Sequence, residues 1–195
     1  MSTELAVPRS RVGQYFFVFA ALIMAVQLVV GLVAAAQFLW PSLLFRFLPF
    51  NIVRMLHINT LVVSLLAGFM GATYFLIAEE GGGELASENA ARWNFWLFAG
   101  GIAAVIAGYL AIVVTGNWSL WFSEGREYIE APRWADWAIV GVVLFFLYNI
   151  WRSVSRRAGW NDLTRMLVIG LGALAFFYLF GMKFFANVAV DQYFW

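Results

Sequence analysis

The sequence predicts an all-α fold, a polytopic bundle of membrane helices. Of the 195 residues, 64% are hydrophobic and 12% are charged, whereas soluble domains average about 45–50% apolar and about 25% charged residues. The mean hydropathy is +0.82. Long apolar runs recur along the chain, and crossing a bilayer of about 30 Å takes about 20 such residues. Because backbone groups inside lipid must be satisfied internally, we expect these runs to be helices.

Five apolar runs predict five transmembrane helices in a single membrane domain that covers residues 1–195. They extend over about residues 14–39, 52–77, 93–114, 135–151 and 166–185. The first run is longer than the core of a signal peptide, and no small-residue cleavage site follows it, so we expect the first helix to be retained.

The distribution of cations predicts a cytoplasmic N-terminus, because inner loops carry an excess of lysine and arginine. In this topology seven cations lie inside and five lie outside. The inner set is Arg9, Arg11, Arg92, Arg152, Arg156, Arg157 and Arg165, and the outer set is Arg46, Arg54, Arg126, Arg133 and Lys183. The dense cluster RSVSRRAGW, read as a loop between two helices, contributes most to this assignment.

Composition excludes several classes of site. The chain contains no cysteine and one histidine, and its net charge is +1. A disulfide framework, a thiolate metal site and covalent attachment of a c-type haem are therefore excluded, and a metal must be held by histidine or oxygen ligands. The charge gives no indication of nucleic-acid binding. A small transporter or channel is disfavoured, because the helix centres lack the acids and lysines typical of ion pathways.

The connectors after the second and third apolar runs differ in character. EEGGGELASENAAR is acidic and glycine-rich, which is typical of a solvated connector, and Ser87 or Asn89 is expected to cap the third helix. TGNWSLWFSEGREYIEAPRW mixes three tryptophans with acids and arginines. An interfacial tryptophan belt explains only part of this composition.

His57, the single histidine, lies in the stretch RMLHINTLVV. It is about five residues into the second helix, so at ~1.5 Å rise per residue it lies roughly 8 Å below the outer boundary. Ionisable residues at this depth usually face the bundle interior. One interpretation is a neutral imidazole hydrogen-bonded to a neighbouring helix, to Asn59 or to a tyrosine. The other is an axial haem ligand, because imidazole nitrogen binds haem iron well.

Charged residues near the same boundary suit haem propionates. Arg54 lies at i−3 from His57, on the same helix face and nearer the aqueous boundary. Arg126 and Arg133 lie in the outer loop at the same level. Together these arginines predict a cationic collar, although snorkelling to phosphate headgroups is an alternative.

Two acids in the outer loop, Glu127 and Glu130, need a further explanation because like charges repel. A divalent cation that bridges carboxylate and propionate oxygens would explain them, since calcium takes several oxygen ligands. The alternative is an ion pair between Arg126 and Glu130 at i+4 with nothing bound, and spacing alone favours that alternative.

Three stretches in order, PFNIVRMLHINTLVVSLLAGFMGATYFLIAEE, GREYIEAP and DQYFW, carry a resemblance to a known family. From about Tyr15 to Trp195 the chain resembles the N-terminal part of the large, catalytic subunit of bacterial respiratory nitric oxide reductases, in the haem–copper oxidase superfamily. The resemblance implies a bundle of about a dozen helices holding a low-spin haem b, a high-spin haem b and a non-haem iron. It also implies conversion of two nitric oxide molecules to nitrous oxide and water.

The resemblance implies roles for individual residues. His57 matches an axial ligand of the low-spin haem, and Arg54 would lie near the propionates. Glu127 would bind a calcium ion that bridges the propionates of the two haems, with Arg126 nearby. Glu130 matches an acid in a region associated with proton uptake from the outer side.

The family's later helices, which supply the iron ligands and the second haem ligand, have no counterpart before Trp195, so no catalytic residue is expected in this chain. A second polypeptide supplies them, or the chain is a truncated product or fragment. As part of a complete oxidoreductase in the bacterial inner membrane, it would receive electrons from a c-type cytochrome partner or another donor. The alternatives are a non-catalytic membrane subunit or remnant without haem, and part of an oxygen-reducing relative.

Overall fold

The computed structural model describes residues 10–82, 84–124 and 131–181, which fold into five α-helices. The helices are α1 (Val12–Leu39), α2 (Phe50–Glu80), α3 (Glu88–Thr115), α4 (Arg133–Ser153) and α5 (Asp162–Gly181). A π-helical turn, η1 (Val154–Ala158), continues α4. The described residues contain no strand, so the all-α prediction is confirmed for this part of the chain.

Four helical segments within the described ranges are long and apolar enough to cross a membrane. They are Val12–Leu39, Phe50–Glu80, Glu88–Thr115 and Trp134–Ala158. The chain is therefore a multi-pass membrane protein by length and composition. The fifth helix exists as α5, but its crossing and the cytoplasmic N-terminus stay predictions, and the end predicted near residue 185 lies outside the described residues.

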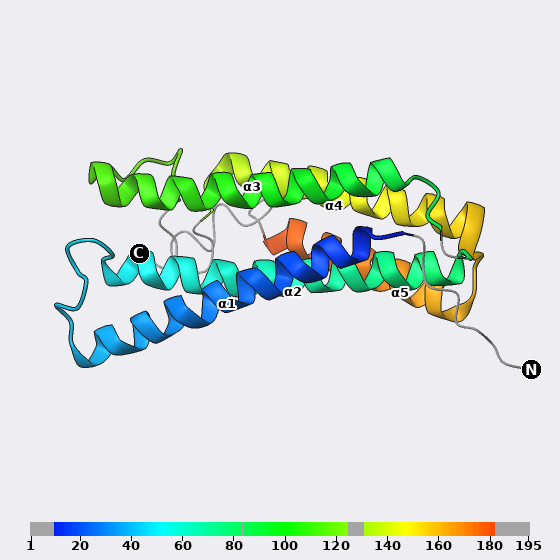
Figure 1. Cartoon of the computed structure of the whole chain (residues 1–195). Coiled ribbons are helices and arrows are strands. Elements are labelled where there is room, and N and C mark those ends of the chain that lie inside the picture. The colour runs from blue at the N-terminus through cyan, green and yellow to red at the C-terminus, as the bar shows by residue number, and fades with distance from the viewer. Residues whose placement is uncertain (1–9, 83, 125–130, 182–195) are drawn as a thin grey trace, which may run out of the picture.

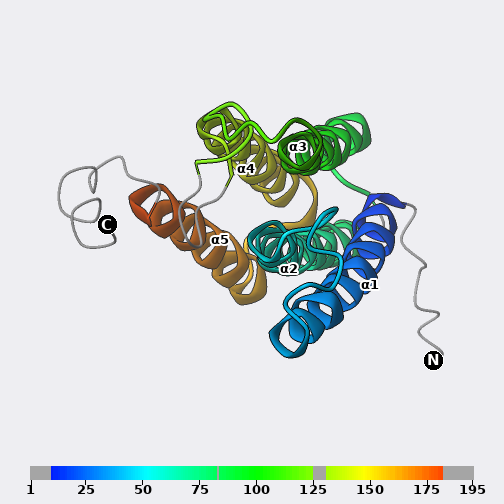
Figure 2. The same cartoon turned by 90° about the vertical axis from the view of Figure 1, so that its left-hand side faces the viewer.

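The helices lie lengthwise beside one another in a bundle (Figure 1). Viewed along the bundle, α2 lies between α1 on one side and the α3–α4 pair on the other, while α5 lies next to α4 (Figure 2). The most extensive helix pairing is that of α1 with α2. A Cβ atom on Gly71 would lie 3.1 Å from the Gly13 carbonyl oxygen, so small residues allow this close approach.

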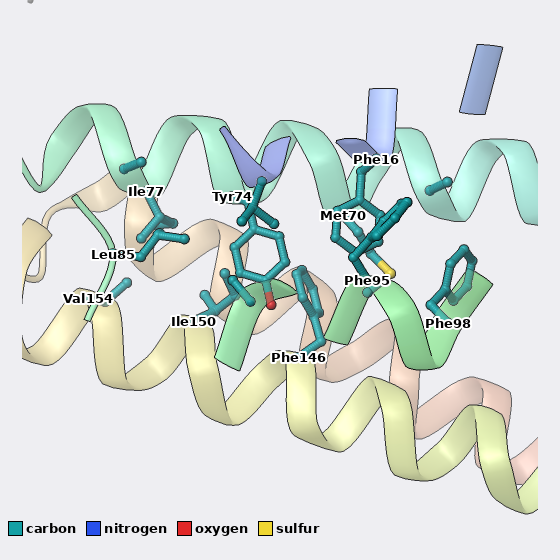
Figure 3. Packing of buried hydrophobic residues seen from close by; sticks show 14 of the residues in the cluster. Phe16, Met70, Tyr74, Ile77, Leu85, Phe95, Phe98, Phe146, Ile150 and Val154 are labelled. Atoms are coloured by element: carbon teal, nitrogen blue, oxygen red, sulfur yellow. The ribbon is translucent and has the colours of Figure 1, made fainter. Parts of the chain in front are cut away.

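The core between these helices is aromatic but contains a polar centre. Figure 3 shows Tyr74 pointing from α2 toward Phe146 of α4, with a ring-centroid distance of 5.1 Å. The Tyr74 hydroxyl donates to Asn94 Oδ1 of α3 and accepts from Asn149 Nδ2 of α4, both at 3.3 Å. Asn94 Nδ2 also donates to the Val142 carbonyl oxygen at 2.9 Å. Side-chain hydrogen bonds therefore join α2, α3 and α4 inside the apolar core.

The connector between α2 and α3 differs from its prediction. Ser87 caps α3 as expected, because its Oγ accepts from Ala90 N at 3.3 Å, while Asn89 lies within the helix. The solvated character is wrong for part of the segment, since Leu85 is buried and Ala86 N donates to Ser153 Oγ of α4 at 3.1 Å. The connector is thus packed onto the end of α4.

The fourth helix, predicted to end near residue 151, ends as α4 at Ser153, and the π-helical turn η1 continues the stretch RSVSRRAGW as helix to Ala158. Gly159 ends the helix with a φ of 78°, a value that glycine adopts without steric cost. Two contacts join this end to the last residue of α2 and to the connector that follows it. Arg157 lies 3.4 Å from Glu84, and Asn161 Nδ2 donates to Glu80 Oε2 at 2.8 Å.

Candidate functional site

His57 lies in the second turn of α2 and faces α1. Its Nδ1 lies 3.0 Å from the Gln27 carbonyl oxygen and 3.3 Å from the Gln27 side-chain Nε2. The hydrogen-bond partner is thus a residue of a neighbouring helix, as one of the two sequence interpretations allowed. Asn59, a candidate partner in that interpretation, donates to the Met55 carbonyl oxygen at 2.8 Å.

The contact with the Gln27 carbonyl oxygen assigns the proton to Nδ1, whereas the amide nitrogen as drawn beside Nδ1 would require Nδ1 to accept. A carbonyl oxygen can only accept, so Nδ1 is protonated and donates to it. In a neutral ring the lone pair then lies on Nε2. Nε2 has no hydrogen-bond partner among the described residues. A histidine held through Nδ1–H with its other nitrogen available is the usual arrangement of a metal-ligating histidine.

Gly31 provides the space that the imidazole occupies beside α1. A Cβ atom at this position would lie 2.5 Å from His57 Cε1 and 2.7 Å from Nδ1, which is closer than real Cβ contacts. Gly31 follows Gln27 by one helical turn, so the two residues share the α1 face that meets the ring. No side chain at position 31 is compatible with this ring position.

Three helix ends meet near His57. Ile52 and Met55 at the start of α2 pack in one buried cluster with Tyr109 and Ile112 near the end of α3 and with Ala135 at the start of α4. The half-buried Arg54 belongs to the same end of α2. The structure therefore brings Arg54 and His57 to the end of the bundle at which the loop after α3 leaves and returns.

The other predicted site residues are not placed by the structure. Arg126, Glu127 and Glu130 lie outside the described residues, and of Arg133 only the backbone position, at the first residue of α4, is described. Lys183 also lies outside. Within the described ranges, no group of three or more His, Cys, Asp or Glu side chains could hold a metal ion. The propionate and calcium roles therefore stay predictions.

Sequence reasoning missed Gln27 and Gly31. The available signal was an amide in the middle of an apolar run, because a buried polar group requires a partner. The sequence does not give the rotation and register of α1 against α2, which determine that the partner is His57.

The fold and this site define a multi-pass helical membrane protein whose second span presents a histidine nitrogen that has no partner within the described ranges. The chain belongs to the family of cytochrome c and quinol oxidase polypeptide I, whose model matches residues 11–194. It is 38% identical over 190 residues to a subunit of the nitric oxide reductase of Stutzerimonas stutzeri. The match covers 94% of this chain and 40% of that relative, so the chain spans about two fifths of the relative's length.

These findings confirm the resemblance to the large subunit of nitric oxide reductases in the haem–copper oxidase superfamily. Membership of this family implies haem cofactors. The similarity gives no test of the role of any single residue.

Proposed function

We propose that this chain is the N-terminal part of the catalytic subunit of a nitric oxide reductase and that His57 is an axial ligand of its low-spin haem b. The observation that carries the proposal is the state of the imidazole, whose Nδ1–H donates to Gln27 O while Nε2 has no partner among the described residues. The similarity to the nitric oxide reductase of Stutzerimonas stutzeri favours nitric oxide over oxygen as the substrate.

Several residues of this chain could bind the proposed low-spin haem b. His57 would hold the iron through Nε2, and Arg54 and Arg126 would neutralise the propionates by charge-assisted hydrogen bonds. A low-spin haem bound there supplies reversible one-electron transfer. α1 packs against the Nδ1 edge of the ring, and Gln27 O holds the ring orientation. Glu127 would bind calcium at the outer loop, and Glu130 would take part in proton uptake.

The complete reaction needs groups from outside residues 1–195. Two nitric oxide molecules, two electrons and two protons give one nitrous oxide and one water. The second ligand of the low-spin haem, the high-spin haem b and the non-haem iron ligands would come from a further segment or a second polypeptide. Electrons would come from a c-type cytochrome partner or another donor. We place the chain in the bacterial inner membrane as a single five-helix domain with a cytoplasmic N-terminus.

His57→Ala in the assembled complex tests the proposal. Removal of the imidazole should abolish the low-spin b-type signal in the reduced-minus-oxidised spectrum while the complex still assembles. Val62→Ala, at an exposed position on α2, is the matched control and should keep the wild-type spectrum. Retention of a bis-histidine spectrum in His57→Ala would sink the assignment. The alternative of a membrane protein without haem predicts no Soret band even in the wild type.

A further inference from the structure

We propose that Gln27 and Gly31 of α1 are the residues that position the His57 imidazole. The Gln27 side-chain amide would also lower the redox midpoint potential of the haem that His57 is proposed to ligate. This inference rests on the proposed function. It assigns a role to α1 that the histidine motif on α2 does not contain.

Steric contact with Gly31 of α1 limits the position of the imidazole. The imidazole lies so close to Gly31 that a single methyl group there would overlap Cε1 and Nδ1. The ring is therefore in contact with the backbone of α1, and its direction is fixed by a second helix. Gly68 is a useful contrast on α2, because a Cβ atom there would meet no described atom within 4 Å.

Both the main chain and the side chain of Gln27 lie within hydrogen-bond distance of His57 Nδ1. Nδ1 cannot donate to the Gln27 carbonyl oxygen and also accept from the Gln27 amide nitrogen. Oxygen and nitrogen of a glutamine amide are assigned from the hydrogen-bond network. Exchanging them puts Oε1 beside Nδ1–H and moves the amide nitrogen to the buried position that has no partner among the described residues. Main chain and side chain of Gln27 then both accept from the imidazole.

The hydrogen bonds to Gln27 affect the basicity of the imidazole. Gln27 is only 7% exposed, so these hydrogen bonds lie in a medium of low dielectric, where they are strong. A hydrogen-bond acceptor beside the N–H that does not bind the metal raises the basicity of the metal-binding nitrogen of a histidine. A more basic ligand favours the oxidised iron, so the side-chain acceptor should lower the midpoint potential.

The test is a redox titration of the low-spin haem in the assembled complex at fixed pH. Gln27→Met keeps the length of the side chain but removes the amide acceptor, so the midpoint potential should rise. Gln27→Glu retains an oxygen acceptor at the same reach, so the potential should stay at or below the wild-type value. Gln14→Leu, at an exposed position on the same helix, should leave it unchanged.

Gly31→Ala tests the steric half of the inference by electron paramagnetic resonance. Displacement of the ring should shift the g-values of the oxidised low-spin haem, whereas Gly68→Ala should leave them unchanged. Wild-type g-values in Gly31→Ala would overturn the positioning role.

The outcomes separate this inference from the proposed function. An unchanged potential in Gln27→Met, or an equal rise in Gln27→Glu and Gln27→Met, would overturn the tuning role while loss of the signal in His57→Ala still supports the ligand. If Gln27→Met fails to assemble, Gln27→Glu decides, and a potential above the wild-type value contradicts the inference. A low-spin signal that survives in His57→Ala overturns both.

Discussion

At the scale of single residues, the side-chain nitrogens of two buried glutamines of α1 have partners outside that helix. Gln27 contacts His57, and Gln37 Nε2 donates to the carbonyl oxygens of Leu43 and Leu48 at 2.9 and 2.8 Å. The second pair ties the connector between α1 and α2 to the end of α1. An unpaired buried polar group costs free energy, and Gln37 Oε1 is buried without a partner among the described residues.

The outer acids give a prediction at this scale. Glu127→Gln should weaken calcium retention and disturb both haem potentials, because the neutral amide loses the charge that attracts the cation. The measurement is the metal content of the purified complex, followed by a redox titration. Glu88→Gln, at the opposite end of the bundle, is the control. Calcium content equal to that of the wild type would count against the assignment.

The sequence identified His57 and Arg54 as the residues of interest but not the surroundings of His57. Its depth in an apolar run is readable from spacing. Gln27 and His57 are 30 positions apart in the chain. Their contact depends on the relative rotation and register of α1 and α2, which no local sequence pattern encodes.

At the scale of secondary-structure elements, the apolar runs predicted the helices better than their ends. α2 continues to Glu80, and α4 with its continuation η1 continues to Ala158, beyond the predicted ends of the apolar runs. Hydropathy marks the part of a helix that suits lipid, whereas the backbone hydrogen bonds continue until a residue such as Gly159 breaks them. The cap at Ser87 was predictable because it depends on local chemistry alone.

The polar centre between α2, α3 and α4 gives the prediction for the elements. Asn94→Ala removes hydrogen bonds to Tyr74 and Val142, and interhelical hydrogen bonds in membranes contribute about 0.6 kcal/mol each. The variant should lose roughly 1 kcal/mol of stability, plus the cost of a small cavity.

The measurement is the temperature at which half of the detergent-solubilised complex loses its monodisperse elution peak. Asn89→Ala removes the same amide from an exposed position of α3 and is the matched control. Equal midpoint temperatures for Asn94→Ala and Asn89→Ala would show that the buried network adds no stability.

At the scale of the whole molecule, large apolar side chains cover the outside of the bundle. Leu32 is 72% exposed and Val114 is 85% exposed. Such surfaces suit lipid or further membrane helices.

The family could be predicted from the sequence, because three motifs in order resemble one family and the comparisons confirm it. The site was predictable only in part. The chain contains one histidine, so the second axial ligand of the proposed haem could not be identified from this sequence.

The central claim is that this chain carries a low-spin haem on His57, and one preparation tests it most directly. The polypeptide containing the chain is purified in mild detergent with its partners, and its intact mass and reduced-minus-oxidised spectrum are recorded. We expect a low-spin b-type signal in a complex that supplies at least one further histidine. An intact, assembled complex without a b-type haem signal would contradict the account.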